Sequence, residues 1–171
     1  YRGDAVLRGF DHDVRGFVGE EMQKKGVRLL LQSEAERIDR QPGSSGLHVR
    51  FTDGEALEVD QVMFATGRVP NVAGLDIQNS GVEVSPDGRV RVNEFSRTNV
   101  DHIYAVGDVT SRVNLTPVAI YEGHAFADSV FGGKARPVTH EFVPSAVFSQ
   151  PPVGTVGFSE VDARHHFGDI D

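Results

Sequence analysis

Two arginines near the start of the chain and one aspartate in its second half are the residues best suited to hold a polar ligand. Arg2 and Arg8 stand six residues apart in YRGDAVLRGFD, around a short turn before an expected helix. A lone arginine pair can equally lie solvated on a loop, so the pair alone does not identify a site. Asp108 ends the run IYAVGD, which with Thr98 fits the pattern T-x4-h-h-A-x-G-D, where h is apolar.

Asp108 is expected at the end of a buried strand over 102–108, at the edge where ligands bind in open α/β sheets. Gly107 would let the backbone approach a ligand closely, and the Asp108 carboxylate can accept hydrogen bonds from a hydroxylated chain such as ribityl. Gly-Asp can also simply begin a turn. The helix expected directly after NLTP favours a site, because its positive N-terminus would stabilise negative charge on a reduced flavin pyrimidine ring.

The elements that must position these residues begin with an amphipathic helix over 11–25. Asp11 is its expected N-cap, and Gly26 its expected stop. The run VRLLL predicts a buried strand over 27–31. A turn over 41–46, a strand over 47–51, an Asp-Gly hairpin over 52–55 and one or two strands over 57–67 complete a small antiparallel meander.

The second half of the chain alternates turns with two expected helices. SPDGR predicts a turn over 85–89 between two short strands. The main helix is expected over 114–132, with Thr116 as its cap and Pro117 at the first helical position. Its expected buried stripe consists of Val118, Tyr121, Ala125 and Val130. A linker over 132–142, strand character over 145–160 broken by Pro151 and Pro152, and a helix over 161–168 follow.

Composition limits the classes of function. The 171 residues suffice for one domain or two small ones, and the net charge of -8 without a basic block argues against nucleic-acid binding. No apolar run approaches the roughly 20 residues that span a bilayer, and no signal peptide is visible. The absence of cysteine excludes thiolate chemistry in this chain and fits a cytoplasmic setting. Because the chain starts at Tyr1 and stops at HHFGDID, we expect a segment of a longer polypeptide.

Four stretches, in chain order, resemble the class I pyridine nucleotide-disulfide oxidoreductases, and among them the glutathione reductases. These stretches are YRGDAVLRGFD, VMFATGRVPN, TNVDHIYAVGDVTSRVNLTPVAI and VPSAVFSQPPVGTVGFSE. The resemblance implies an α/β fold of Rossmann-like FAD- and NAD(P)-binding domains with a small antiparallel meander, followed by the start of an α+β dimerisation domain. It places the end of an NADPH domain at 1–75, the end of an FAD domain at 76–140 and the start of an interface domain at 141–171.

The resemblance also implies roles for individual residues. Arg2 and Arg8 match arginines that bind the 2′-phosphate of NADPH, for which guanidinium forks are suited. Gly67 matches a glycine lining the nicotinamide-nucleotide site, and Asp108 a ligand of the FAD ribityl chain. The start of the helix beneath the flavin ring is matched by Leu115 and Thr116. Asn114 and Ala146 are placed near the nicotinamide.

The implied function is NADPH-dependent reduction of glutathione disulfide through FAD and a redox cysteine pair, by a homodimer. The cysteine pair and the glycine-rich loops are expected before Tyr1, and a catalytic His-Glu pair after Asp171, so no catalytic residue is predicted here. His124 replaces an arginine found in many glutathione reductases, which leaves trypanothione reductase or another FAD-dependent disulfide reductase open. A non-catalytic nucleotide-binding fragment is a further alternative. The histidines 124, 165 and 166 are expected at the surface, and no metal site is predicted.

Overall fold

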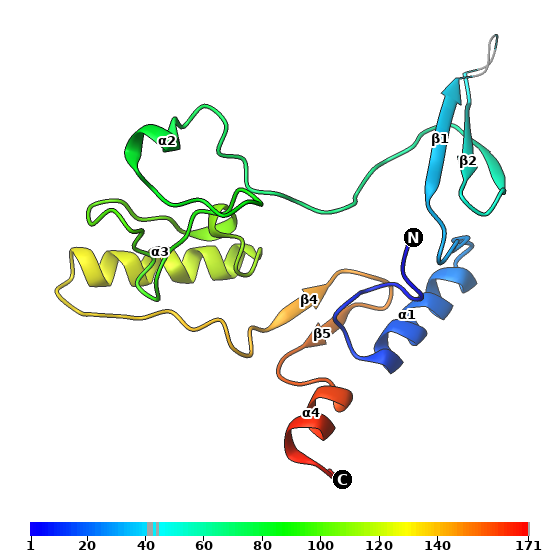
Figure 1. Cartoon of the computed structure of the whole chain (residues 1–171). Helices are drawn as coiled ribbons and strands as arrows, with labels where there is room; N and C mark the ends of the chain where they lie inside the picture. The colour runs from blue at the N-terminus through cyan, green and yellow to red at the C-terminus, as the bar shows by residue number, and fades with distance from the viewer. Residues whose placement is uncertain (41–42, 44, 171) are drawn as a thin grey trace. The chain divides into compact units, whose positions relative to one another are not determined.

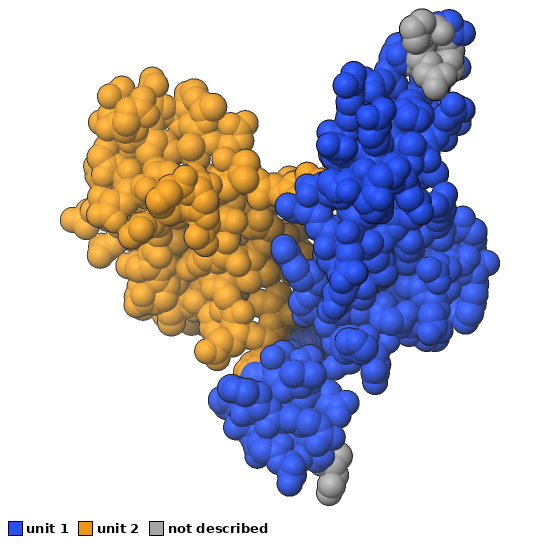
Figure 2. All heavy atoms as spheres, turned by 45° about the vertical axis from the view of Figure 1, so that its right-hand side comes forward, with its two compact units in different colours: residues 1–65, 144–171 blue, residues 66–143 orange. Residues whose placement is uncertain are grey.

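A computed structural model describes residues 1–40, 43 and 45–170 of the chain (Figure 1). They form two units, residues 1–65 with 144–171 and residues 66–143, coloured separately in Figure 2. The first unit contains α1 (His12–Lys24), β1 (Ala35–Arg40), β2 (Leu47–Phe51), β3 (Ala56–Val59), β4 (Ser145–Val147), β5 (Val153–Thr155) and α4 (Glu160–Phe167). The second contains α2 (Ile77–Ser80), the 3-10 helix η1 (Gly107–Thr110) and α3 (Thr116–Val130). Within the described residues, no helix is long and apolar enough to cross a membrane.

The first turns of the two helices of the first unit both donate a backbone N–H group to Asp11, while Ser159 is the N-cap of α4. Asp11 caps α1, as predicted, since its Oδ1 accepts the N–H of Asp13 at 3.0 Å. Its Oδ2 accepts the N–H of Glu160, the first residue of α4, also at 3.0 Å. The backbone turns away from α1 at Gly26, whose φ of +88° is readily adopted by glycine. The predicted helices over 11–25 and 161–168 are therefore both confirmed.

The predicted pair of antiparallel strands around the 52–55 turn is confirmed as β2 and β3, which form a sheet of order β1-β2-β3 together with a strand that was not predicted. Val49 of β2 pairs with Ile38 of β1 and with Leu57 of β3, so three apolar residues lie side by side on one face. The turn over 52–55 closes β2 onto β3, with the Phe51 N–H donating to the Glu55 carbonyl. The turn predicted over 41–46 lies partly outside the described residues.

Two strand predictions in this unit differ from the structure, and one strand was not predicted. Residues 27–31 form no strand; instead, backbone hydrogen bonds join residues 30–33 to residues 1–3. The prediction over 57–67 holds only to Val59, because Val59 pairs with Leu47, the first residue of β2, and the ladder ends there. By contrast, β1 was not predicted, since its sequence AERIDR is mostly polar. The strand character over 145–160 is confirmed as the β4–β5 hairpin, which the two prolines interrupt.

In the second unit, α3 and η1 provide the framework for Asp108. The helix predicted over 114–132 is confirmed over Thr116–Val130, but Leu115 and not Thr116 is its N-cap. The strand predicted over 102–108 is wrong: residues 96–98 and 103–105 exchange backbone hydrogen bonds, and the chain then enters η1. The SPDGR turn is confirmed, with the Ser85 N–H donating to the Arg89 carbonyl at 2.8 Å.

The buried stripe of α3 also differs from the prediction. Val118 and Ala125 are buried as expected, but Tyr121 and Val130 are exposed. Glu122 takes the place between the two buried residues and is only 1% exposed. A carboxylate can lie at such a position only when hydrogen-bond donors surround it, and the site described below provides them.

Candidate functional site

The predicted binding residues lie in two groups, one in each unit. Arg2 and Arg8 belong to the first unit, and Gly67, Asp108, Leu115 and Thr116 to the second. Each group has its own supporting contacts, which arise from residues that the sequence reading did not single out.

The turn between the two arginines is held by a third arginine. Arg15 of α1 reaches back to this turn, where its Nε donates to the Val6 carbonyl at 2.9 Å and its Nη2 to the Ala5 carbonyl at 3.0 Å. The same Nη2 lies 2.8 Å from the Asp4 carboxylate, and this hydrogen bond lowers the pKa of Asp4. Arg15 therefore fixes the backbone on which the predicted pair is presented.

The two predicted arginines themselves point to solvent. The Arg2 side chain is 71% exposed, and its Nε lies 3.9 Å from Oε1 of Glu34, a separation that leaves the guanidinium largely free. Arg8 is exposed as well. Both guanidinium groups are thus accessible to an anion.

Asp108 and the segment around Gly67 meet in the second unit. Asp108 is the second residue of η1, and its side chain is 48% exposed. Nη1 of Arg68 lies 3.9 Å from Oδ2 of Asp108. Gly67 has a φ of +128°, and an added Cβ there would meet no atom within 4 Å. In this structure the backbone conformation, and not crowding, is therefore what favours glycine at position 67.

The start of α3 presents backbone donors beside η1. Leu115 is extended, with φ -130° and ψ 134°, and its side chain makes no capping hydrogen bond. The Val118 and Ala119 N–H groups donate to the Leu115 carbonyl. Pro117 has no N–H, so Thr116 is left as the donor at the tip of the helix, where the helix dipole is positive.

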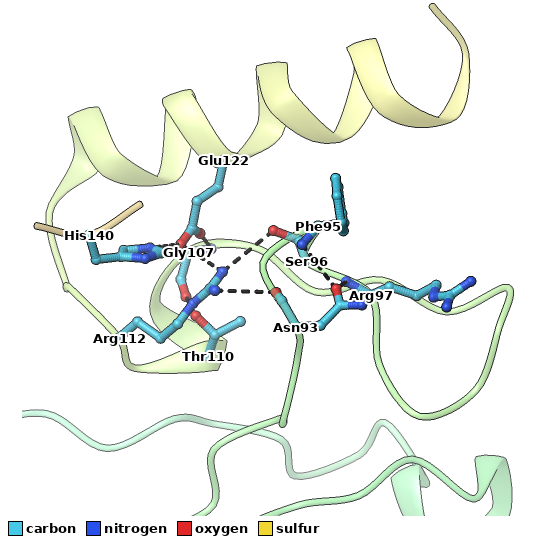
Figure 3. A network of polar contacts seen from close by, with 9 residues as sticks. All are labelled: Asn93, Phe95, Ser96, Arg97, Gly107, Thr110, Arg112, Glu122 and His140. Carbon is cyan, nitrogen blue, oxygen red and sulfur yellow. Dashed lines mark hydrogen bonds and ion pairs between the residues drawn. The ribbon is translucent and has the colours of Figure 1, made fainter. Parts of the chain in front are cut away.

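A buried network centred on Glu122 reaches Gly107, the residue directly before Asp108 (Figure 3). Oε2 of Glu122 accepts the backbone N–H of Gly107 at 2.5 Å. Its Oε1 lies 3.1 Å from Nη2 of Arg112 and 2.6 Å from Nε2 of His140. The carboxylate thus has partners on both oxygens, which explains how its charge is accommodated in the interior.

The remaining candidates are placed at the surface. His124, His165 and His166 are exposed, as predicted. Asn114 and Ala146 are exposed too, one in each unit. Among the described residues, no group of three or more His, Asp or Glu side chains could hold a metal ion.

Residues 1–123 match the family of pyridine nucleotide-disulphide oxidoreductases. The chain belongs to this family. The resemblance read from the four sequence stretches is thereby confirmed, since three of them lie within the matched residues.

The chain has relatives of two kinds. A glutathione reductase of Burkholderia cepacia is 52% identical over 171 residues, which are 100% of this chain and 38% of that protein. A trypanothione reductase of Trypanosoma congolense is 44% identical over 167 residues, covering 98% of this chain and 34% of that protein. The chain thus spans 34–38% of the length of these two relatives.

Solved structures extend the likeness to three dimensions. The HOCl-induced flavoprotein disulfide reductase RclA from Escherichia coli superposes with a TM-score of 0.92 at 28% identity, covering 100% of this chain and 39% of that one. LpdA from Mycobacterium tuberculosis gives 0.86 at 29% identity, covering 96% and 36%. The predicted α/β fold class of the chain is confirmed by these likenesses together with the family match.

Sequence reasoning missed two residues that support the candidate site, Arg15 and Glu122. Arg15 left no signal, because an arginine on an amphipathic helix is ordinary. Glu122 did leave one: it is spaced four residues after Val118 and three before Ala125, on the apolar stripe of α3. A carboxylate at such a position predicts cationic or amide partners elsewhere in the chain.

Proposed function

We propose that this chain forms part of an NADPH-dependent flavoprotein disulfide reductase that reduces glutathione disulfide to glutathione. The observation that carries the proposal is the 52% identity to a glutathione reductase along all 171 residues. The redox cysteine pair is proposed to lie elsewhere in the longer polypeptide, because this chain contains no cysteine.

The residues around Asp108 fit an FAD site. Asp108 offers an accessible carboxylate, and a sugar-alcohol chain such as ribityl presents hydroxyl donors to such a group. Thr116 would donate its N–H to the flavin pyrimidine ring, where the positive end of α3 stabilises negative charge. FAD, when bound, carries electrons from the nicotinamide to the disulfide. Leu115 would set the point at which α3 begins, and so the position of that N–H.

The accessible guanidinium groups of Arg2 and Arg8 support NADPH as the electron donor. A phosphate dianion accepts paired N–H donors from a guanidinium fork, and two forks on one turn can hold it from two sides. Gly67 would line the nicotinamide-nucleotide site. The adjacent guanidinium of Arg68 places a further positive charge near this segment.

We also propose the division into an NADPH-domain part at 1–75, an FAD-domain part at 76–140 and the start of an interface domain at 141–171. The interface domain would form a homodimer. Exposed aromatic residues support a docking role for that last segment, since Phe148 is 93% exposed. The expected location of the enzyme is cytoplasmic.

A trypanothione reductase is the second candidate function. His124 stands at a position where, from the resemblance, many glutathione reductases have an arginine. It is exposed on α3. The 44% identity to the Trypanosoma congolense trypanothione reductase supports this candidate. The third candidate is a non-catalytic nucleotide-binding fragment, for which the purified 171-residue chain would show no stoichiometric flavin absorbance.

NADPH oxidation by the full-length polypeptide tests the proposal, with glutathione disulfide and trypanothione disulfide assayed side by side. Turnover with glutathione disulfide is the expected result. Turnover with trypanothione disulfide alone would assign the second candidate while keeping the cofactor sites. If bound FAD is present and neither disulfide is reduced, the proposed substrate is wrong.

A further inference from the structure

The geometry points to Glu122 as a positioning residue that holds Asp108 in place for its contact with the flavin. This inference rests on the proposed function, because it takes Asp108 as the ribityl ligand. Glu122 does not reach the ligand surface itself, since its side chain is buried. It acts through the backbone of Gly107, the residue that directly precedes Asp108.

Both polar groups of the Gly107 backbone are held by side chains. Its N–H donates to Oε2 of Glu122, and its carbonyl accepts from the Thr110 hydroxyl at 2.8 Å. Gly107 and Thr110 are both buried, so water does not compete for these bonds. The backbone entering Asp108 is therefore fixed by hydrogen bonds on both sides.

Packing restricts the same residue. The φ of Gly107 is +72°, and a Cβ at this position would lie 3.0 Å from the Cβ of Ala119 in α3. The Gly107 backbone thus lies directly against α3, the helix that also carries Glu122. One helix supplies both the steric contact and the hydrogen-bond acceptor, and its N-terminus supplies the Thr116 N–H proposed for the flavin.

The other oxygen of Glu122 ties two further segments to this framework (Figure 3). Arg112 follows η1, and its Nη1 also donates to the Asn93 carbonyl at 3.3 Å. His140 comes from the segment after α3. These two cationic or polar partners orient the carboxylate, so that Oε2 remains directed at Gly107.

A double-mutant cycle on FAD affinity tests the inference, with the full-length apoprotein titrated with FAD by fluorescence. E122A removes the acceptor and is expected to weaken FAD binding by about tenfold, the loss typical of one charge-assisted hydrogen bond. E122Q keeps one acceptor oxygen, for which Gly107 competes with Arg112 and His140, and is expected to restore only part of the affinity. In a D108A background, E122A should weaken binding by less than about twofold, because its effect passes through Asp108.

Three outcomes would overturn the inference. Equal FAD affinity of the unaltered protein and E122A would show that Gly107 needs no such support. Independent effects, in which the losses of D108A and E122A multiply, would indicate a general structural role. If the unaltered protein binds no FAD, the proposed function fails and the inference with it, whereas the first two outcomes leave that function intact.

Two further variants control for misfolding. E122D keeps the carboxylate that faces Arg112 and His140. Its side chain is one methylene shorter, so its oxygen lies farther from the Gly107 N–H. It is expected to weaken FAD binding in a protein that still folds, and it replaces E122A in the cycle if E122A does not fold. E83A removes an exposed glutamate of the same unit and should leave FAD affinity unchanged.

Discussion

Gly107 and Ala119 are in such close contact that a methyl group on the glycine would lie 3.0 Å from the Ala119 Cβ. Gly107 also has a φ of +72°, a conformation that costs an L-residue about 1–2 kcal/mol. The contact therefore joins η1 to α3 in a way that depends on the absence of a side chain.

Replacing Gly107 with alanine should lower the free energy of unfolding by about 2–5 kcal/mol, because strain and crowding add. Urea unfolding followed by circular dichroism measures this loss. Gly123→Ala is the matched control, since Gly123 lies within α3 and an added Cβ there meets no atom within 4 Å. That variant should gain about 0.5–1 kcal/mol from helix propensity. Equal stability of Gly107→Ala and the unaltered protein would contradict the contact.

Asp87 should make stability depend on acidity. The Ser85 hydroxyl and then Arg89 lower its pKa from 3.8 to about 2. Because the pKa is lower in the folded state, the unfolded chain binds more protons at acidic pH. The stabilisation is full above about pH 5 and is lost as the pH falls towards 2.

The measurement is the free energy of unfolding of the unaltered protein and of Asp87→Asn at several pH values. The difference between the two should shrink as the pH falls from about 5 to about 2. Ser85→Ala removes the largest cause of the shift and should give an intermediate profile. A difference that stays constant over this range would argue against the Asp87 contacts.

Asp11 should link the starts of two helices that are distant in sequence. Hydrogen bonds from the Glu160 and then the Asp13 N–H groups lower its pKa. Asp11→Ala removes both acceptors, so α1 should fray at its N-terminus and the Glu160 N–H of α4 should lose its partner, while Ser159 still caps α4. Hydrogen exchange would detect faster exchange of the Asp13 and Glu160 amides. Asp11→Asn keeps one amide oxygen as an acceptor and should protect only one of the two sites.

Arg2 and Arg8 should determine which nucleotide the full-length enzyme prefers. Alanine at either position is expected to raise the KM for NADPH by about tenfold or more, because a charge-assisted phosphate contact is lost. The KM for NADH should change little. Arg28→Ala is the matched control, since Arg28 is an exposed arginine of the same unit whose Nη2 lies 2.6 Å from Glu55. Equal losses with both nucleotides would argue against phosphate recognition.

The sequence was sufficient for elements whose signals are local. Asp11 correctly predicted the start of α1, and Pro117 correctly predicted the first turn of α3. Both signals are local, because capping and proline placement act within a few residues. The strand predicted over 27–31 failed because an apolar run does not reveal which backbone will pair with it. The polar strand β1 was missed for the same reason, since only its partner β2 makes it a strand.

The candidate site divides in the same way. Asp108 and the start of α3 could be read from a motif of adjacent residues. The partners of Glu122 could not, because Gly107, Arg112 and His140 come from three different segments. Their meeting is a property of tertiary packing, which no spacing along the chain encodes.

The buried carboxylate of Glu122 also limits how this part of the chain can diverge. A single exchange of Glu122 for an apolar residue leaves the guanidinium of Arg112 and the imidazole of His140 without their shared acceptor. Apolar packing around α3 is therefore accessible only if positions 112, 122 and 140 change together. The three positions are therefore energetically coupled. A protein in which only one of them is exchanged is expected to be less stable than the present protein or one in which all three are exchanged.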